Sequence, residues 1–344
     1  MKHTFLLILF FSLGCLKQSE PIVSEKIIYI YPTLDFVYDL ALQNDTLYVA
    51  NGESGIKVFK IVNEGDMAIE SLYEGIAFSE EENIINIEFS QVSGILFALD
   101  KFNYTYAITK SAIFDLGLSF MKGISDCSQY QSKSIILDDS STPDILTLYR
   151  KIDQFDENNR STVIGKVGFS DLYYFNGEDC TNDILIDFNY RLTDLDFNND
   201  RLYLSNANRN ILSINVYDEN EGDFSFAFED TLLVEPLTVS AYQNTYVVGL
   251  DNNAGCYIAL LDVNGIIEGK FSIADGFTIR DIHYSNNLLV LSAGYGGVLV
   301  YDWDGETTPT QRAMIASGYA YSTLVYENNK IIVGTKNGIE IYEI

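Results

Sequence analysis

The chain has 344 residues, of which 47% are hydrophobic, and both Tyr (24) and Phe (21) are abundant. This composition excludes an intrinsically disordered chain and favours a large β-sheet core. The formal net charge of −28 makes nucleic acids and anionic lipid surfaces poor partners, because like charges repel.

Residues 1–14 have the composition of an export signal. A short basic start precedes the apolar run Phe5–Leu13, which spans about nine residues and is too short to cross a bilayer. The run ends at Ser12-Leu13-Gly14-Cys15, which resembles the lipobox of bacterial lipoproteins, although Ser12 stands where that motif prefers an aliphatic residue. The resemblance implies cleavage before Cys15 and lipidation of Cys15. The alternative is an ordinary secretory signal with an incidental Cys.

The segment that follows has the composition of a tether. Residues 15–25 contain the lipidated Cys and a polar stretch with one Pro, and 26–344 is predicted to be a single folded domain. No later segment is long and apolar enough to cross a membrane. We therefore expect a cell-envelope lipoprotein that touches the membrane only through its lipid. In a Gram-negative host, Leu16 after the Cys resembles the signal for outer-membrane sorting.

Three further Cys remain. Export permits a disulfide between Cys127 and Cys180, but the strand assignment places them in loops at opposite ends of one sheet, so the pairing stays open. Cys256 lies among apolar residues and is predicted to be a small buried side chain.

A repeated pattern of short predicted strands occurs along the chain. Near the start, Asp39–Leu42 is followed by Leu47–Ala50 and then by Gly55–Phe59, and the same order returns between Leu324 and Tyr342. Seven such units can be counted, spaced by roughly 42 to 49 residues with one gap of roughly 59, which is the length of a propeller blade. The first strands of the units are predicted at Phe36–Leu42, Ile85–Phe89, Ser134–Leu137, Thr193–Phe197, Leu237–Ala241, Ile279–Tyr284 and Tyr321–Tyr326.

The second strand of each unit carries a small residue after a large apolar one. Small residues let neighbouring sheets approach near a common axis, and strands buried on both faces are apolar throughout. The small residues are Ala50, Ala98, Thr147, Ser205, Gly249, Ser292 and Gly334.

The ends of the chain predict how the ring closes. The last unit stops at Ile344 after three strands, and Lys26–Tyr31 can supply the missing outer strand, which leaves no open sheet edge. The predicted fold is therefore an all-β, seven-bladed β-propeller of four-stranded antiparallel sheets, closed by the N-terminal strand, which completes the last blade.

Two segments indicate a family. Gly55–Ile61 and, more closely, Gly297–Asp302 resemble the third strand of the LVIVD repeat, a propeller unit of exported proteins. The resemblance extends over 26–344 but is sharp in only three units, and the units between Ile85 and Asp187 depart from it. It implies a fold and an extracytoplasmic location, and no particular activity.

Histidine catalysis has little support. After removal of residues 1–14, His283 is the single histidine, so a Ser–His–Asp or Cys–His site can use only this residue, and zinc sites built from several His are absent. His283 is either a ligand-contacting residue at the channel or a core histidine.

Three aspartates recur where the inner strands begin. Asp39, Asp194 and Asp281 are therefore candidate ligand residues at the mouth of a central channel, and a ring of acids there suits a hard cation such as Ca²⁺. The structural alternative is that each carboxylate accepts hydrogen bonds within its own turn.

Two other segments weakly resemble calcium loops. Asp218–Asp223 and Asp302–Glu306 both lack the full ligand pattern of the twelve-residue loop, and both stand where a hairpin turn is expected. Trp303 is the one Trp of the chain, which counts against a quinone cofactor, because quinone-dependent propellers carry a Trp in most blades. The cofactor prediction is therefore none, with Ca²⁺ kept as a candidate.

The longest unit contains an extended polar loop. Residues 151–166 lengthen the connection between its second and third strands, and a loop of this kind on a rigid ring is either a contact element or a tolerated insertion. The candidate partner residues in this loop are Asp153, Asp156, Glu157 and Arg160.

These features predict a lipid-anchored extracytoplasmic binding or scaffold module for protein or glycan partners, with no nucleic-acid partner. The alternative is a Ca²⁺-dependent, lactonase-like hydrolase with acids at the channel, because propeller hydrolases resemble this plan. A role in outer-membrane protein assembly is a third hypothesis, which rests on analogy of fold and location alone.

Overall fold

The structure is a computed structural model of the chain. It describes residues 26–62, 68–76, 83–89, 91, 94–100, 105–109, 130–138, 144–151, 165–171, 186–188, 192–198, 201–206, 210–218, 223–262, 264–327 and 329–344. All the regular secondary structure in these ranges is β-strand. The same ranges contain no helix long and apolar enough to cross a membrane.

The described strands form seven antiparallel sheets. The first contains β2 (Asp39–Gln43), β3 (Thr46–Ala50), β4 (Ile56–Val62) and β5 (Ala68–Ile76), and the second contains β6 (Ile84–Phe89), β7 (Ile95–Asp100) and β8 (Thr105–Thr109). The third contains β9 (Tyr130–Asp138), β10 (Asp144–Lys151), β11 (Gly165–Asp171) and β12 (Ile186–Phe188).

The fourth sheet contains β13 (Leu192–Asn198), β14 (Arg201–Asn206), β15 (Ile211–Asp218) and β16 (Asp223–Thr231). The fifth contains β17 (Pro236–Tyr242), β18 (Thr245–Leu250), β19 (Cys256–Leu261) and β20 (Ile267–Ile273). The sixth contains β21 (Asp281–Ser285), β22 (Leu288–Ser292), β23 (Val298–Asp302) and β24 (Thr310–Ile315). The seventh contains β25 (Ala320–Tyr326), β26 (Lys330–Thr335), β27 (Gly338–Glu343) and β1 (Lys26–Pro32).

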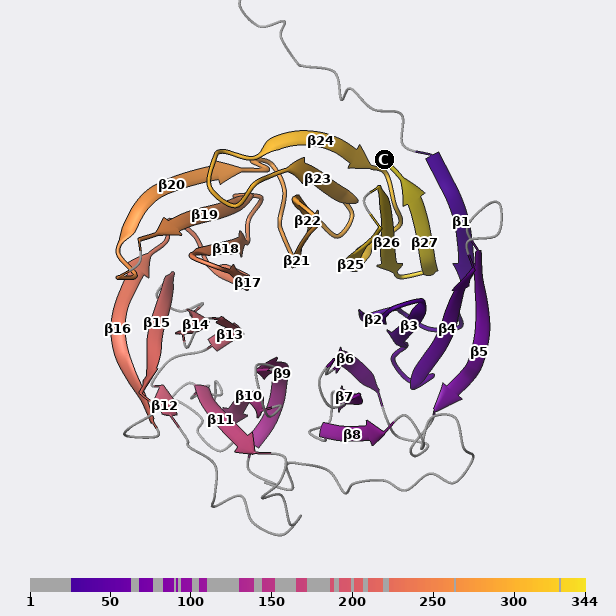
Figure 1. Cartoon of the computed structure of the whole chain (residues 1–344), viewed down its shortest axis with the longest axis horizontal. Helices are drawn as coiled ribbons and strands as arrows, with labels where there is room; N and C mark the ends of the chain where they lie inside the picture. The colour runs from indigo at the N-terminus through magenta and orange to yellow at the C-terminus, as the bar shows by residue number, and fades with distance from the viewer. Residues whose placement is uncertain are drawn as a thin grey trace, which may run out of the picture.

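The sheets stand side by side around a central opening (Figure 1). The first strand of each unit is the innermost, and each of β2, β6, β9, β13, β17, β21 and β25 contacts the next, with β25 also contacting β2. This is the arrangement of a β-propeller. The inner strands therefore form the wall of a channel.

The two ends of the chain meet in the seventh sheet. Strand β1 pairs antiparallel with β27, with Ile27 opposite Tyr342 and Tyr31 opposite Ile339. The pairing gives the C-terminal sheet its outer strand, as expected from the sequence, and it covers the edge that β27 would otherwise expose.

The second strands are the packed centre of each wedge. Every residue of β18 and of β22 is buried, which explains why these segments are apolar without alternation. A Cβ added to Gly334 would lie 2.7 Å from Val37 Cγ1, and one added to Gly249 would lie 2.8 Å from the carbonyl oxygen of Ile279. Val37 and Ile279 belong to the units that follow, so these glycines set how closely neighbouring sheets approach, as predicted.

Hairpin turns between first and second strands use the residues that tolerate left-handed backbone. Asn44 has φ 51°, and Asn286 and Asn287 have φ 53° and 60°. Asn is among the few non-Gly residues that adopt this region readily, so the Asn-rich turns fix the hairpins that connect the inner strands to the buried ones.

Candidate functional site

The carboxylate of Asp39, at the start of β2, joins three sheets. Its Oδ2 accepts hydrogen bonds from the Ile87 N–H (3.0 Å) and from Asn86 Nδ2 (2.5 Å) of the second sheet. Its Oδ1 accepts from Ser322 Oγ (3.0 Å) of the seventh sheet and from the Leu40 N–H (2.8 Å). A single side chain therefore connects segments 283 residues apart in the sequence.

Asp194 and Asp281 repeat this arrangement. Asp194 Oδ2 accepts from the Val239 N–H (3.0 Å) and from Thr238 Oγ1 (2.8 Å) of the next sheet, and Asp281 Oδ2 accepts from the Thr323 N–H (2.9 Å). The structural alternative, hydrogen bonds within its own turn, therefore holds for Asp39 through the Leu40 N–H, but it leaves out the bonds from the next sheet. The recurring aspartate mainly accepts from the following inner strand, where a backbone N–H would otherwise lack a partner.

A second row of polar side chains lies two residues further along the inner strands. Asp196 follows Asp194 and His283 follows Asp281 at this spacing, which places each pair on one side of its strand. Glu88 stands two residues after Asn86 and joins the same row. The sequence pattern indicated His283 but neither Glu88 nor Asp196; the signal that could have found them is the period of two, counted from the first row.

The acids of both rows lie close enough to affect one another. Burial, and then the charges of Asp39, Asp196, Asp281 and Asp194, raises the pKa of Glu88 well above its usual range. These five residues come from four sheets, and each is partly exposed. Mutual repulsion of this kind is expected where several carboxylates share a region with few cations.

Two of these acids titrate near neutrality. Burial and then the charge of Asp39 raise the pKa of Asp281 to about 7, and burial raises that of Asp196 to about 7 in spite of its hydrogen bonds from the N–H groups of Ala241 and Phe197. Burial also raises the pKa of Asp39. The channel wall is therefore a set of carboxyl groups, part of which keep their protons at neutral pH.

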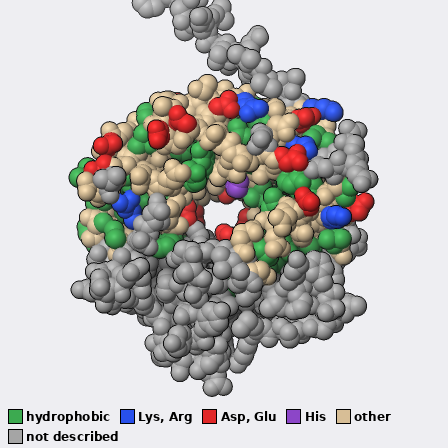
Figure 2. Space-filling model, in the orientation of Figure 1, with side chains coloured by type: hydrophobic (Ala, Val, Ile, Leu, Met, Phe, Trp, Pro, Cys, Tyr) green, Lys and Arg blue, Asp and Glu red, His purple; other side chains and the backbone are tan. Residues whose placement is uncertain are grey.

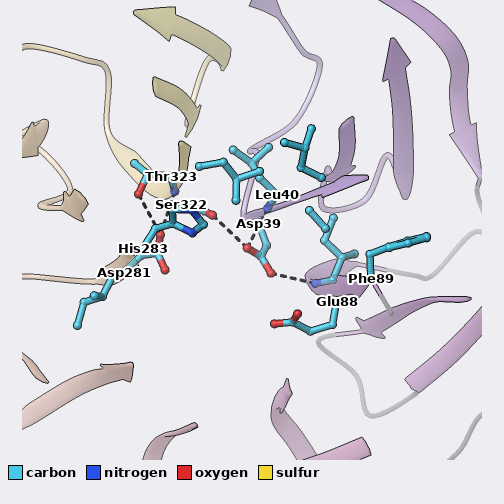
Figure 3. A pocket seen from close by; sticks show the side chains of 13 residues that line it. Asp39, Leu40, Glu88, Phe89, Asp281, His283, Ser322 and Thr323 are labelled. Carbon is cyan, nitrogen blue, oxygen red and sulfur yellow. Dashed lines mark hydrogen bonds between the residues drawn. The ribbon is translucent and has the colours of Figure 1, made fainter. Parts of the chain in front are cut away.

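His283 supplies no positive charge to this wall. Burial lowers the pKa of its imidazole to about 4, so the ring is neutral at neutral pH. It lies beside Asp281, the acid of its own strand, and lines the same cavity (Figure 3). Its neutral form can donate a hydrogen bond from one nitrogen and accept one at the other, but it does not compensate the carboxylates.

A cavity of about 280 Å³ runs between four of the inner strands. Asp39, Glu88, Asp281, His283 and Ser322 are among the side chains that line it (Figure 3). In the space-filling view, acidic side chains and the histidine are visible at the wall of the central opening (Figure 2). The structure thus places three of the four predicted channel residues on one cavity, while Asp194 acts on it through its charge.

These carboxylates are not arranged as a metal site. Within the described ranges, no group of three or more His, Cys, Asp or Glu side chains converges closely enough to hold a metal ion. Calcium needs oxygen ligands at about 2.3–2.6 Å from one point, whereas the first-row acids here point to hydrogen-bond donors of neighbouring sheets.

Five aromatic side chains gather at the N-terminal ends of the inner strands, next to the acids. We call this group the aromatic collar: Phe36, Tyr38, Tyr295, Tyr319 and Tyr321. Ring centroids are 4.7 Å apart for Tyr295–Tyr319 and for Tyr319–Tyr321, 5.2 Å for Tyr38–Tyr321 and 5.9 Å for Phe36–Tyr321. The collar therefore spans three neighbouring units, and its outermost ring, Tyr295, is 86% exposed.

A glycine makes space for one ring of the collar, and charged side chains lie beside two others. A Cβ on Gly294, which has φ +55°, would lie 3.1 Å from the Tyr319 ring, so the glycine makes space for that side chain. Lys336 Nζ lies over the Phe36 ring at 5.2 Å from its centroid. Asp35 and Glu53 lie near Tyr38, where burial and then their charges raise the pKa of the phenol.

One of the two predicted calcium-like segments, Asp302–Glu306, is a turn that satisfies its own polar groups. Asp304 Oδ1 accepts from the N–H groups of Glu306 (2.9 Å) and Thr307 (2.8 Å), so its carboxylate stabilises that turn. Trp303 is buried and donates from Nε1 to the carbonyl oxygen of Thr307 (2.7 Å), which is a structural role. Of the second segment, Asp218–Asp223, residues 219–222 lie outside the described ranges.

Several other predictions fall on residues that the structure does not describe. They concern Cys15, the tether, the pair Cys127 and Cys180, and the loop residues Asp153, Asp156, Glu157 and Arg160. Cys256 is described and is buried and unpaired, as expected, and burial raises the pKa of its thiol.

Comparisons with known proteins support the fold. No family model matches the sequence, and no curated protein matches it. The WD40 β-propeller domain of Doa1 is similar in structure, with a TM-score of 0.63 at 11% identity, over 94% of this chain and 98% of that one. The computationally designed Ika8 protein has a TM-score of 0.60 at 13% identity, over 93% of this chain and 100% of its own. At such identities the likeness shows the fold alone: this chain is an all-β protein of propeller type.

Proposed function

We propose that the protein is a lipid-anchored extracytoplasmic binding or scaffold module for polypeptide or glycan partners. The single observation that carries this proposal is the aromatic collar, in which contiguous Tyr and Phe rings stand at the ends of inner strands whose next residues, Asp39 and Ser322, line an acidic cavity. Tyr offers a large, stiff and amphipathic contact area at low entropic cost, which is why binding surfaces are enriched in it.

The proposal includes a complete seven-bladed ring. The pairing of β1 with β27 and the contact of β25 with β2 support it, because an open array would leave sheet edges that need polar caps. We also propose that the repeat unit is of the LVIVD type, on the strength of Gly297–Asp302, which here forms a turn and the buried third strand β23.

The proposed membrane anchoring depends on lipidation of Cys15, which can be tested directly. A clickable fatty acid supplied to the expressing cell should label the wild-type protein and not Cys15→Ser, and the variant should leave the membrane fraction. An unlabelled wild-type protein would remove the anchor from the proposal and leave a secreted module.

The binding role needs a test at the collar. A photo-crosslinking amino acid in place of the exposed Tyr295 should give discrete adducts in intact cells. The matched control is Ile266, which is 64% exposed on the turn between β19 and β20, at the opposite ends of the strands. Equal adduct patterns at the two positions would count against a binding face at the collar.

The second candidate function is the Ca²⁺-dependent hydrolase. The observation that favours it is a pair of carboxyl groups, Asp196 and Asp281, with pKa values of about 7, the range suited to general acid–base catalysis. If Ca²⁺ binds the native protein, a chelator should lower the melting temperature, because a ligand bound only to the folded state stabilises it. An unchanged melting curve would leave the binding module as the better proposal.

A further inference from the structure

The cavity begins at Asp39 and Ser322, which directly follow the collar residues Tyr38 and Tyr321, and its described lining contains acids but no Lys or Arg. Asp39, Glu88, Asp281 and His283 line it, and the histidine is neutral at neutral pH. Asp194 and Asp196 add to the negative potential at Glu88. Of the described cations nearest to this region, Lys336 lies over the Phe36 ring and Arg280 lies beside Tyr321, both at the level of the collar.

We infer that the aromatic collar binds a basic segment of a polypeptide partner, whose Arg or Lys side chain passes the rings and enters the acidic cavity. This inference rests on the proposed binding function and names the chemistry of its partner. Charge complementarity carries it: the collar offers π-faces to a cation, and the wall below offers carboxylates.

The spacing of the acids favours an organic cation over a metal ion. No three described carboxylate or imidazole groups converge on one point, yet the acids are close enough to raise the pKa of one another. A guanidinium carries five N–H donors spread over a plane, so it can contact carboxylates that are too far apart for a metal. The cavity of about 280 Å³ is near the lower limit of about 300 Å³ for drug-sized ligands, which suits one side chain.

The collar already demonstrates the contact that the inference requires. Lys336 Nζ lies 5.2 Å from the centroid of the Phe36 ring, within the distance of about 6 Å at which a cation is attracted to an aromatic face. Tyr295, Tyr319 and Tyr321 have ring edges or faces left for a partner, since Tyr295 is 86% exposed and the other two are partly exposed. A peptide backbone lying across these rings would place its basic side chains toward the channel.

The test uses the full chain in detergent and fluorescence anisotropy. The probes are a short Arg-rich peptide, the same peptide with neutral citrulline in place of Arg, and spermidine as a competitor. The variants are Tyr295→Ala at the collar, Glu88→Gln in the cavity, and Tyr242→Ala as a control. Tyr242 is an exposed tyrosine at the C-terminal end of an inner strand, away from the collar.

We expect the Arg peptide to bind at least about tenfold more tightly than the citrulline peptide, with weaker binding at high salt. Tyr295→Ala and Glu88→Gln should each weaken it by about threefold to tenfold, and Tyr242→Ala should not. Binding should also release protons near pH 6.5, because a bound cation favours the ionised form of the cavity acids.

Equal affinity for the two peptides would overturn the inference, and so would an affinity that neither Tyr295→Ala nor Glu88→Gln changes. If spermidine displaces the peptide and its own binding is insensitive to Tyr295→Ala, the occupant is a free polyamine and the polypeptide assignment is wrong. If neither peptide binds while crosslinking at Tyr295 still yields adducts, this inference fails and the binding module stands.

Discussion

A carboxylate at the outer part of the ring and the carboxylates of the inner strands have opposite surroundings. Asp230, on β16, contacts Lys270 Nζ at 2.7 Å and accepts from the hydroxyls of Tyr246 (2.7 Å) and Tyr257 (2.6 Å). Burial would raise the pKa of Asp230, but these three partners outweigh it and the pKa is lowered. Asp281 has no such cation beside it, and burial, followed by the charge of Asp39, raises its pKa to about 7.

The surroundings of Asp230 and of the channel-wall acids indicate different roles for the two sets of carboxylates. Where a buried carboxylate serves only the sheet, this chain provides a cation and two phenols to stabilise the charge. At the channel wall it provides backbone N–H groups of the next sheet and no described cation within the cavity lining. The inner acids therefore hold sheets together while keeping a negative potential that an external partner can satisfy.

The largest effect on stability is expected from the difference in packing between the second strands, where neighbouring sheets meet closely, and the outer strands. Gly334→Val should destabilise the protein by about 3 kcal/mol, because its Cβ would meet Val37 Cγ1 at 2.7 Å and the Val37 carbonyl oxygen at 3.1 Å. Gly269→Ala is the control on the outer strand β20, since its Cβ would be 3.5 Å from Leu260 and in ordinary contact. Urea unfolding measures both, and equal midpoints would contradict close inter-sheet packing at the second strands.

The second effect tests the outer carboxylate. Asp230→Asn should cost about 2 kcal/mol at pH 7, because it removes the charge on which Lys270, Tyr246 and Tyr257 converge at a site that is 6% exposed. The matched control is Asp302→Asn, which breaks the more exposed pair with Arg312 and should change stability by less than about 0.5 kcal/mol. The destabilisation by Asp230→Asn should shrink in acid, since a lowered folded pKa gives stability that is lost as the pH falls through it.

The third effect has the opposite pH dependence. The folded pKa of Asp281, about 7, is above the ordinary 3.8, so its stabilising contribution is complete below pH 3.8, falls between 3.8 and about 7, and is absent above. Asp281→Asn imitates the protonated form, and its amide oxygen can still accept from the Thr323 N–H. Relative to wild type, the variant should therefore gain more than about 1 kcal/mol between pH 5 and pH 8, as measured by urea unfolding at each pH. A difference that does not change with pH would show that burial and the neighbouring charges do not raise the pKa of Asp281.

Much of the fold could be predicted because the same strand pattern occurs in several repeat units, so each unit supports the assignment of the others. Two sets of residues recur at the same place in several units. One is the set of small residues on the second strands, such as Gly249 and Gly334, and the other is the aspartates at the start of the inner strands, Asp39, Asp194 and Asp281. The partners of these aspartates could not be predicted, since the hydrogen bond that all three accept comes from a strand roughly one unit away along the chain. Comparing the units therefore identifies the aspartate that accepts the hydrogen bond, but not the N–H group of the next unit that donates it.

The collar and Glu88 were missed for a related reason. Tyr295 and Tyr319 lie in connections that follow different strands, so their side chains meet only when the sheets are placed side by side. In the second unit, Asn86 stands where the fourth and sixth units have Asp194 and Asp281, so no recurring aspartate precedes Glu88 by two residues. Aromatic residues in loops carry no period that a sequence pattern can detect, and the period of two reaches Glu88 only when it is counted from Asn86.

The smallest expected effect concerns His283, the one basic side chain among the described residues that line the cavity. Burial lowers its pKa to about 4, so the imidazole should titrate far below the ordinary value of 6.5. Its contribution to stability is complete above pH 6.5 and falls as the pH drops toward 4, because the unfolded chain takes up the proton first. Proton NMR of the wild type, with the signal assigned by its loss in His283→Gln, measures this titration. A pKa near or above 6.5 would mean that the surrounding carboxylates stabilise the imidazolium, and the channel would then contain its own cation.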